Sequence, residues 1–295
     1  MNMTHEILNV LSLVNRLKRQ PDAHKGDAGK VLLVGGAKTM SGALVLAGQA
    51  ALYSGAGWVV LMMLDASSAH LVAEQPELMV HDAQTLEPVD ALKLIQPDVI
   101  AIGPGLGQSP FALQWLKTVL SWPAPLVIDA DAINLMAMHR ELLTALHQRE
   151  QACTLTPHPG EAARLLAYSS AEVQADRSRS LLQLIELTNS VVVLKGHQSL
   201  IASPDHATVQ CMQGNPALAV GGSGDVLTGC MAALIAQGKK HQLDQWQATS
   251  LAVQLHALAA DRLVAKKVGP IGMTPSELAH ELRDCINAQM DRVEK

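Results

Sequence analysis

The sequence predicts an α/β protein with a mainly parallel central sheet, helices on both faces and a short antiparallel edge. Two patterns predict this fold. Between residues 31 and 187, short apolar runs alternate with longer amphipathic stretches, which is typical of βαβ units. After residue 191, apolar runs follow one another closely across tight turns, which is typical of antiparallel strands. With 295 residues, of which 48% are hydrophobic, the chain can bury the core of such a sheet.

The first strands and helices follow from that alternation. Each predicted strand is short, apolar and followed by Gly, Pro, Asp or a turn cluster. The predicted parallel strands are Val31–Val34, Trp58–Met62, Val99–Ile102, Leu126–Ile128, Thr154–Leu155 and Val191–Leu194. The predicted helices between them include Gly42–Ser54, Phe111–Leu120, Pro159–Leu166 and Val173–Leu187.

The C-terminal part is predicted to add the antiparallel edge and then to become helical. Ser199–Ala202 and Thr208–Cys211 are the antiparallel strands, and Gly224–Ala236 and Gln245–Ala265 are helices with apolar faces. A last helix opens at Thr274, because proline in the first helical position and Glu277 three residues later complete a capping box.

The N-terminal segment, residues 1–24, is predicted to form a helical arm that breaks near Pro21. Its apolar residues are Ile7, Leu8, Leu11, Val14 and Leu17. No linker, repeat or low-complexity segment interrupts the rest of the chain, so we expect residues 1–295 to form one catalytic domain with this arm as its only separable part.

Composition argues against several functions. Aromatic residues make up 2% of the chain and the formal net charge is −5, so neither stacked nucleic acid bases nor a membrane surface is the expected partner. The four cysteines are far apart and are expected to be free thiols of a reducing compartment. Because no apolar stretch reaches about 18 residues and the N-terminus is polar, we expect a cytoplasmic protein.

Glycine-rich or polar turns follow five of the predicted strands. In open parallel sheets, ligands bind beyond the carboxyl ends of the strands, so five such turns along one edge predict a long cleft for an extended ligand. The five turns begin at Gly35, Gly103, Asp129, Thr156 and Lys195. None has the spacing of a dinucleotide-binding fingerprint or a Walker A loop.

The run Gly221-Gly222-Ser223-Gly224 is the best candidate for holding phosphate. The apolar residues after it recur at helical spacing, so the run leads into a helix N-terminus, which is a natural anion site. We therefore expect an anion hole formed by Gly222, Ser223 and Gly224.

Asp225 follows this run directly. It could simply be a first-turn acid that favours the helix, but a cap needs no run of glycines. A carboxylate beside an anion hole makes chemical sense if a hydroxyl lies between them and Asp225 accepts its proton. We expect the helix dipole to keep Asp225 ionised, as a weak base suited to phosphoryl transfer.

With these motifs in their order, the sequence resembles the ADP-dependent (S)-NAD(P)H-hydrate dehydratases of the ribokinase-like superfamily. The matching motifs lie between residues 24 and 229, and include Gly103–Gly107, Asp129–Asn134, Thr156–Glu161 and Gly221–Gly229. The resemblance implies a three-layer sandwich and a carbon–oxygen lyase. Such an enzyme phosphorylates the ring hydroxyl of hydrated NADH or NADPH with ADP, and loss of phosphate then gives NAD(P)H, AMP and phosphate.

The resemblance also implies residue roles. Asp225 would be catalytic. The hydrated cofactor would contact Ala43, Gly105, His158 and Asp225. The adenine nucleotide would contact Lys195, Gly196, His197, Gln198, Ser199 and Gly224. Asp131, Asn134 and Asn215 would help to shape the site.

Two positions depart from the family pattern on the side of the phosphoryl donor. Val220 stands where a threonine is usual, and Ser199 stands where Thr is common. The resemblance further implies Mg²⁺ with the phosphates, a homo-oligomer, and a separate NAD(P)H-hydrate epimerase as functional partner. No His, Cys and carboxylate cluster offers an all-protein metal site. Two alternatives remain open: a small-molecule kinase of the same fold for a sugar, thiazole or pyridoxal-like alcohol, and a nucleotide-sensing protein.

Overall fold

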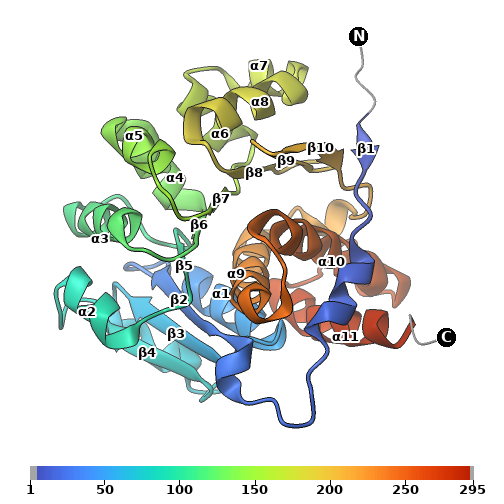
Figure 1. Cartoon of the computed structure of the whole chain (residues 1–295), viewed down its shortest axis with the longest axis horizontal. Helices are drawn as coiled ribbons and strands as arrows, with labels where there is room; N and C mark the ends of the chain where they lie inside the picture. The colour runs from blue at the N-terminus through green and yellow to red at the C-terminus, as the bar shows by residue number, and fades with distance from the viewer. Residues whose placement is uncertain (1–4, 293–295) are drawn as a thin grey trace.

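A ten-stranded sheet runs through the part of the chain that the computed structural model describes, residues 5–292 (Figure 1). Its strand order is β1-β10-β9-β8-β7-β6-β5-β2-β3-β4, and only the β8–β9 and β9–β10 pairs are antiparallel. The mainly parallel sheet and its antiparallel edge are therefore confirmed. The strands are β1 (Glu6–Ile7), β2 (Lys30–Gly35), β3 (Trp58–Met63), β4 (Leu78–Asp82), β5 (Val99–Ile102), β6 (Leu126–Ile128), β7 (Cys153–Leu155), β8 (Val191–Leu194), β9 (Leu200–Ser203) and β10 (His206–Gln210).

Helices cover both faces of this sheet (Figure 1). One layer holds α1 (Ser41–Tyr53), α9 (Ser223–His241), α10 (Gln245–Ala265) and α11 (Pro275–Arg292). The other holds α2 (Pro88–Ile95), α3 (Pro110–Ser121), α4 (Ala130–Met138), α5 (Glu141–His147), α6 (Pro159–Leu166), α7 (Ser170–Ala175) and α8 (Arg177–Thr188). Short 3₁₀ helices are η1 (Leu11–Leu17), η2 (Lys25–Ala28), η3 (Ala66–Val72) and η4 (Pro216–Leu218).

The strand β2 shows why both layers are needed. Val31 and Leu33 point into the core beneath α1 and α9, whereas Leu32 and Val34 point into the core on the opposite face. All four side chains are fully buried. Alternating side chains that are apolar on both faces leave no side of the strand for water, as expected of a parallel sheet between two helical layers.

The strand β4 at the sheet's outer edge was not predicted. Leu78 is buried, but Met79 is exposed and the next three residues are half-buried, so the apolar run typical of a central strand is missing here. An edge strand pairs on one side only, so it needs less apolar surface than a central strand does.

Residues 1–4 of the predicted helical arm lie outside the described residues, and the remainder of the arm is helical only in part. It forms β1, which pairs in parallel with β10, and then the 3₁₀ helix η1. Within η1, the apolar residues Leu11, Val14 and Leu17 recur every third residue, which places them on one face of a helix with three residues per turn. Leu8, Val14 and Leu17 are buried in the core, so this part of the arm packs against the rest of the chain.

The predicted helix Val173–Leu187 is two helices. Helix α7 ends at Ala175. Asp176, with φ of −143°, is both the C-cap of α7 and the N-cap of α8. The Asp176 carboxylate accepts a hydrogen bond from the Arg179 N–H at 2.9 Å. A second N-cap inside an apolar periodicity ends one helix and starts another.

Helix α9 lies very close to α1. A Cβ atom on Gly229 would stand 1.9 Å from the Ala47 carbonyl oxygen, so only glycine allows this approach. Gly229 therefore fixes the position of α9, and with it the helix N-terminus at the carboxyl edge of the sheet.

Candidate active site

The first turn of α9 meets the carboxyl ends of the central strands. Gly222, with φ of +98°, adopts the left-handed conformation that turns the chain into the helix, and a Cβ there would stand 2.7 Å from Leu46. The Ser223 N–H donates to the Val220 carbonyl at 3.3 Å. The N–H groups of Gly224 and Asp225 lie in the first turn, where no earlier turn supplies acceptors. This end of α9 can therefore receive an anion.

A buried ion pair joins three elements beside that turn. The Lys195 Nζ donates to Asp129 Oδ1 at 2.7 Å, and the Thr228 hydroxyl of α9 donates to Asp129 Oδ2 at 2.7 Å. Burial disfavours the Asp129 carboxylate, but the Lys195 charge and these hydrogen bonds outweigh it and hold its pKa below the usual range. Burial likewise opposes the Lys195 ammonium, and attraction by Asp129 and Glu161 outweighs it and raises the pKa of Lys195. Both residues are therefore charged at neutral pH.

Gly224 lies against this pair. A Cβ at Gly224 would stand 3.5 Å from Lys195 Nζ and 3.9 Å from Asp129 Oδ2. The lysine that the resemblance assigns to the nucleotide thus adjoins the predicted anion hole. Its positive charge can offset phosphate charge at this point.

The half-buried Asp225 carboxylate lies in the same turn and has no hydrogen-bond partner among residues 5–290. Burial, followed by repulsion from Asp129, raises its pKa to about 7. The prediction that the helix dipole keeps Asp225 ionised is therefore wrong at this position, because burial and the neighbouring carboxylates outweigh a dipole effect of about 1 kcal/mol. A free carboxylate that titrates near neutral pH is a better general base than the one we predicted.

His158 and Glu161 form a second pair, at the start of α6. His158 Nδ1 accepts the Gly160 N–H at 2.9 Å, so the ring proton is on Nε2, which faces Glu161 Oε1 at 3.4 Å. Glu161 also accepts the His158 backbone N–H at 2.8 Å and lies 4.0 Å from Lys195 Nζ. Burial raises the pKa of Glu161 to about 7 and lowers that of His158. Nδ1 and Nε2 of the neutral ring thus face Gly160 and Glu161. A ligand would therefore contact the face of the His158 ring rather than a ring nitrogen.

Gly105 lies where the turn after β5 approaches the loop before α1. Its φ is +57°, and a Cβ there would stand 2.3 Å from the Met40 carbonyl oxygen. The close approach comes from the protein's own backbone rather than from a ligand. Ala43 lies in the first turn of α1, and its N–H donates to the same Met40 carbonyl at 3.2 Å. The Gly36 and Ala37 N–H groups donate to the carbonyls of Pro104 and Gly105 at 3.0 and 2.7 Å, so the loop before α1 is held against the turn after β5.

Asp131 and Asn134 on α4 hold the loop after β5. The Asp131 carboxylate accepts the Gly107 N–H at 2.9 Å and a longer bond from Asn134 Nδ2 at 3.4 Å. Asn134 Oδ1 in turn accepts a bond from Arg164 at 2.9 Å. The side chains of Asp131 and Asn134 therefore hold the loop in place through these hydrogen bonds.

Helix α10 holds both ends of the glycine-rich segment. Asp261 accepts the Gly214 N–H at 2.9 Å and Asn215 Nδ2 at 2.8 Å. The buried His256 donates from Nε2 to the Ser223 carbonyl at 3.0 Å, and burial lowers its pKa to about 4, so it is neutral. Asn215 thus shapes the segment from outside the anion hole.

The segment from Lys195 to Ser199 joins β8 to β9 beside this site. Gly196 and His197 are exposed, and Gln198 and Ser199 are half-buried. The Ser199 hydroxyl donates to the Gly196 carbonyl at 3.3 Å. Val220, at the other side of the anion hole, is 38% exposed and has no hydroxyl to offer there.

Sequence reasoning did not single out Asp129, Glu161, Thr228, His256 or Asp261. Asp129 and Glu161 lie within the motifs named above, and Asp129 directly follows an apolar strand, which is a signal that could have marked it. Nothing local marks the other three, because their partners come from elements far away in the sequence.

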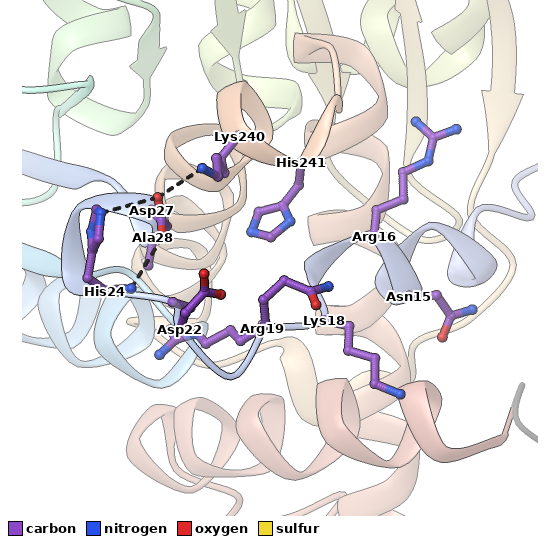
Figure 2. Close-up of a pocket in the computed structure, with 12 residues that line it drawn as sticks. Asn15, Arg16, Lys18, Arg19, Asp22, His24, Asp27, Ala28, Lys240 and His241 are labelled. Carbon is purple, nitrogen blue, oxygen red and sulfur yellow. Dashed lines mark hydrogen bonds and ion pairs between the residues drawn. The ribbon is translucent and has the colours of Figure 1, made fainter.

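A cavity of about 650 Å³ lies elsewhere, between the N-terminal arm and the C-terminal end of α9 (Figure 2). At one side of it, Asp27 lies 3.2 Å from Lys240 and 3.8 Å from His24. Asp225 lies in the first turn of α9 and Lys240 in its last turn, so about 22 Å of helix separates this cavity from Asp225. It belongs to a different region from the chemistry described above.

Within residues 5–292, three or more His, Cys, Asp or Glu side chains nowhere gather in a way that could hold a metal ion. Nor does any helix in this range have both the length and the apolar character needed to cross a membrane.

The mainly parallel sheet, with an anion-receiving helix N-terminus, a free carboxylate and a lysine at its carboxyl edge, defines a protein of the ribokinase-like class. Within that class, a sequence profile of the NAD(P)H-hydrate dehydratase family matches residues 31–284. The chain therefore belongs to the NAD(P)H-hydrate dehydratase family.

Two relatives agree with this assignment. The chain is 37% identical over 269 residues to an ADP-dependent (S)-NAD(P)H-hydrate dehydratase of Neisseria meningitidis, covering 90% of this chain and 87% of that one. It is 40% identical over 270 residues to a bifunctional NAD(P)H-hydrate repair enzyme of Coxiella burnetii, covering 92% of this chain and 53% of that one. The chain thus spans about half the length of its bifunctional relatives.

Among solved structures, the ADP/ATP-dependent NAD(P)H-hydrate dehydratase of Bacillus subtilis, co-crystallised with ATP and Mg²⁺, is similar with a TM-score of 0.80. It shares 30% identity, over 98% of this chain and 99% of that one.

Proposed function

We propose that this protein is a carbon–oxygen lyase that repairs the S form of hydrated NADH and NADPH with ADP as the phosphoryl donor. The observation that carries the proposal is the pairing of a free carboxylate, Asp225, with the first-turn amides of α9. The name of the Neisseria meningitidis relative supports the substrate and the donor.

The reaction divides into two steps. In the first, the ring hydroxyl of the hydrated nicotinamide attacks the terminal phosphoryl group of ADP. Asp225 takes the hydroxyl proton, AMP leaves, and the first-turn amides and Lys195 stabilise the charge of the moving phosphoryl group. In the second, the ring carbon–oxygen bond breaks and phosphate leaves. The neighbouring ring carbon loses a proton, and the double bond of NAD(P)H is restored.

Residue roles follow from this scheme. We propose that Gly222, Ser223 and Gly224 form the anion hole, and that Ala43, Gly105, His158 and Asp225 contact the hydrated cofactor. Lys195, Gly196, His197, Gln198 and Ser199, with Gly224, contact the adenine nucleotide. Asp131, Asn134 and Asn215 act indirectly, because their side chains hold the loops that line the site.

Magnesium fits these residues as a companion of the phosphates rather than as a resident ion. Both Asp129 oxygens accept hydrogen bonds, from Lys195 and Thr228, and the Glu161 carboxylate faces His158. Asp225 is therefore the carboxylate of this cluster that is free to bind a ligand. Mg²⁺ commonly binds through one or two carboxylates and the substrate phosphates. When bound it would neutralise phosphate charge, and Asp225 is the residue placed to orient it.

The test is turnover of hydrated NADH with ADP or ATP, with Mg²⁺ present or removed by a chelator. We expect the absorbance of reduced nicotinamide and inorganic phosphate to rise together, in equal amounts. A stable phosphorylated product without recovery of NADH would contradict the proposal and indicate a kinase of the same fold.

We further propose that the protein is a cytoplasmic homo-oligomer that works beside an NAD(P)H-hydrate epimerase. The name of the Coxiella burnetii relative, a bifunctional repair enzyme, supports an accompanying second activity. Light scattering on the purified protein tests the oligomer. A faster repair of mixed hydrate isomers when an epimerase is added tests the partnership.

A further inference from the structure

One arginine holds the whole turn between β8 and β9. Arg177 Nη2 donates to the Leu194 carbonyl at 3.0 Å, and Nη1 donates to the carbonyls of His197 at 2.6 Å and Gln198 at 3.2 Å. These three acceptors lie on both sides of Gly196. One guanidinium therefore fixes the start and the end of the segment 195–199.

The turn needs such a support because its backbone is unusual. Gly196 has φ of +147° and Gln198 has φ of +56°, so two of five residues have positive φ. A left-handed conformation is unfavourable for a non-glycine residue such as Gln198. A Cβ on Gly196 would stand 3.2 Å from Arg177 Nη2, so the turn also lies directly against the guanidinium.

The position of Arg177 is unfavourable for a positively charged side chain. It is the first residue of α8, where the helix dipole disfavours a cation. Its Nε is buried without a hydrogen-bond partner. No acidic side chain within residues 5–290 forms a salt bridge with it. A half-buried cation without a counter-ion is a poor contribution to stability, but it creates positive potential for an anionic ligand.

We propose that Arg177 is a positioning residue for the phosphoryl donor: it holds the 195–199 turn in the shape that receives ADP, and its uncompensated charge favours the nucleotide's anion there. The inference deepens the proposed function and rests on it, because the turn is assigned to the nucleotide there. The adjacency of Lys195 to Gly224 supports that placement, since the same turn begins beside the anion hole.

The variants follow from the geometry. Arg177→Ala removes the three hydrogen bonds and the charge, and Arg177→Lys keeps the charge but cannot span the carbonyls of Leu194 and Gln198 with one ammonium. Arg177→Gln retains one donor group and removes the charge. It provides a second test of the proposal if Arg177→Ala does not fold. Arg179→Ala is the matched control, because it removes an exposed arginine from the same turn of α8.

Calorimetric titration with ADP and steady-state kinetics give the readouts. We expect Arg177→Ala and Arg177→Lys to raise Kd and KM for ADP about tenfold or more, with kcat and KM for the hydrated cofactor changed less than about threefold. Arg177→Gln should be weakened as well, and Arg179→Ala should match the wild type. Unchanged ADP affinity in folded Arg177→Ala or Arg177→Gln, or full recovery in Arg177→Lys, would overturn the proposal.

The two proposals fail separately. If the wild type binds ADP but does not repair hydrated NADH, the proposed function is wrong, while the ADP titrations of the Arg177 variants still test this inference. If the wild type repairs the hydrate and Arg177→Ala binds ADP normally, only the role of Arg177 is wrong.

Discussion

Lys195 and Asp129 lie 2.7 Å apart at the ends of two strands, β8 and β6, that are separated in the sheet by β7. Asp129 is 1% exposed and also accepts the Thr228 hydroxyl of α9. The pair therefore fastens the anion-receiving helix N-terminus to the carboxyl edge of the sheet. It also leaves a lysine beside the place where phosphate is proposed to bind.

Loss of Lys195 should affect both stability and nucleotide binding. In Lys195→Met the buried Asp129 carboxylate loses its counter-ion, which typically costs about 3–5 kcal/mol. We expect a lower free energy of unfolding in urea and weaker ADP binding. The double variant Asp129→Asn/Lys195→Met should regain most of the stability but not the ADP affinity. Recovery of both would show that Lys195 acts on the fold alone.

Removal of the proposed base should separate chemistry from binding. Asp225→Asn keeps the size of the side chain but cannot accept the hydroxyl proton. General base catalysis contributes about 10²- to 10⁴-fold, so we expect kcat to fall by at least that order, while ADP affinity measured without Mg²⁺ stays within a few-fold. Stopped-flow absorbance and calorimetry provide the two measurements, with Asp205→Asn on an exposed turn as control. Near-normal turnover would rule out the proposed role.

The pH profile should report the raised pKa of Asp225. The base acts when it is ionised, and its pKa is about 7, so kcat/KM should be level above that pH and fall tenfold per unit below it. Glu161 also has a pKa of about 7, so Glu161→Gln is the necessary control. The acidic limb should persist in Glu161→Gln and vanish from the residual activity of Asp225→Asn. The opposite result would assign the limb to Glu161.

Two glycines of the same run should respond differently to substitution. Valine at Gly224 would push its γ-methyl groups beyond a Cβ that already lies 3.5 Å from Lys195 Nζ, into the proposed phosphate site. A Cβ at Gly221 meets nothing within 4 Å. We expect Gly224→Val to lose ADP affinity at least about tenfold, and Gly221→Ala to bind as the wild type does. Equal affinity in a calorimetric titration of both would argue against the anion hole.

Much of the fold was predictable because its signals are local. Each central strand is an apolar run ended by glycine, proline or aspartate, and the last helix opens with the capping box of Thr274 and Glu277 that the structure shows. The form of the arm was misjudged because Ile7, Leu11 and Val14 have the spacing of a helix of 3.6 residues per turn, whereas Leu11, Val14 and Leu17 have the spacing of three residues per turn. Its burial against α10 and α11 is not encoded within the arm itself (Figure 1).

Sequence alone determined three features: the order of the motifs along the chain, the helix that starts at the glycine run, and the place of Asp225 in the first turn of that helix. All three depend on neighbours along the chain. Only the tertiary structure decided the electrostatics of that carboxylate. Asp129 and Lys195 follow the strands β6 and β8, and Glu161 lies in the first turn of α6, so their distances to Asp225 exist only once the sheet is assembled. Burial and charge act through distances in space rather than along the chain. The pKa of Asp225, about 7, could therefore not be read from its position in the sequence.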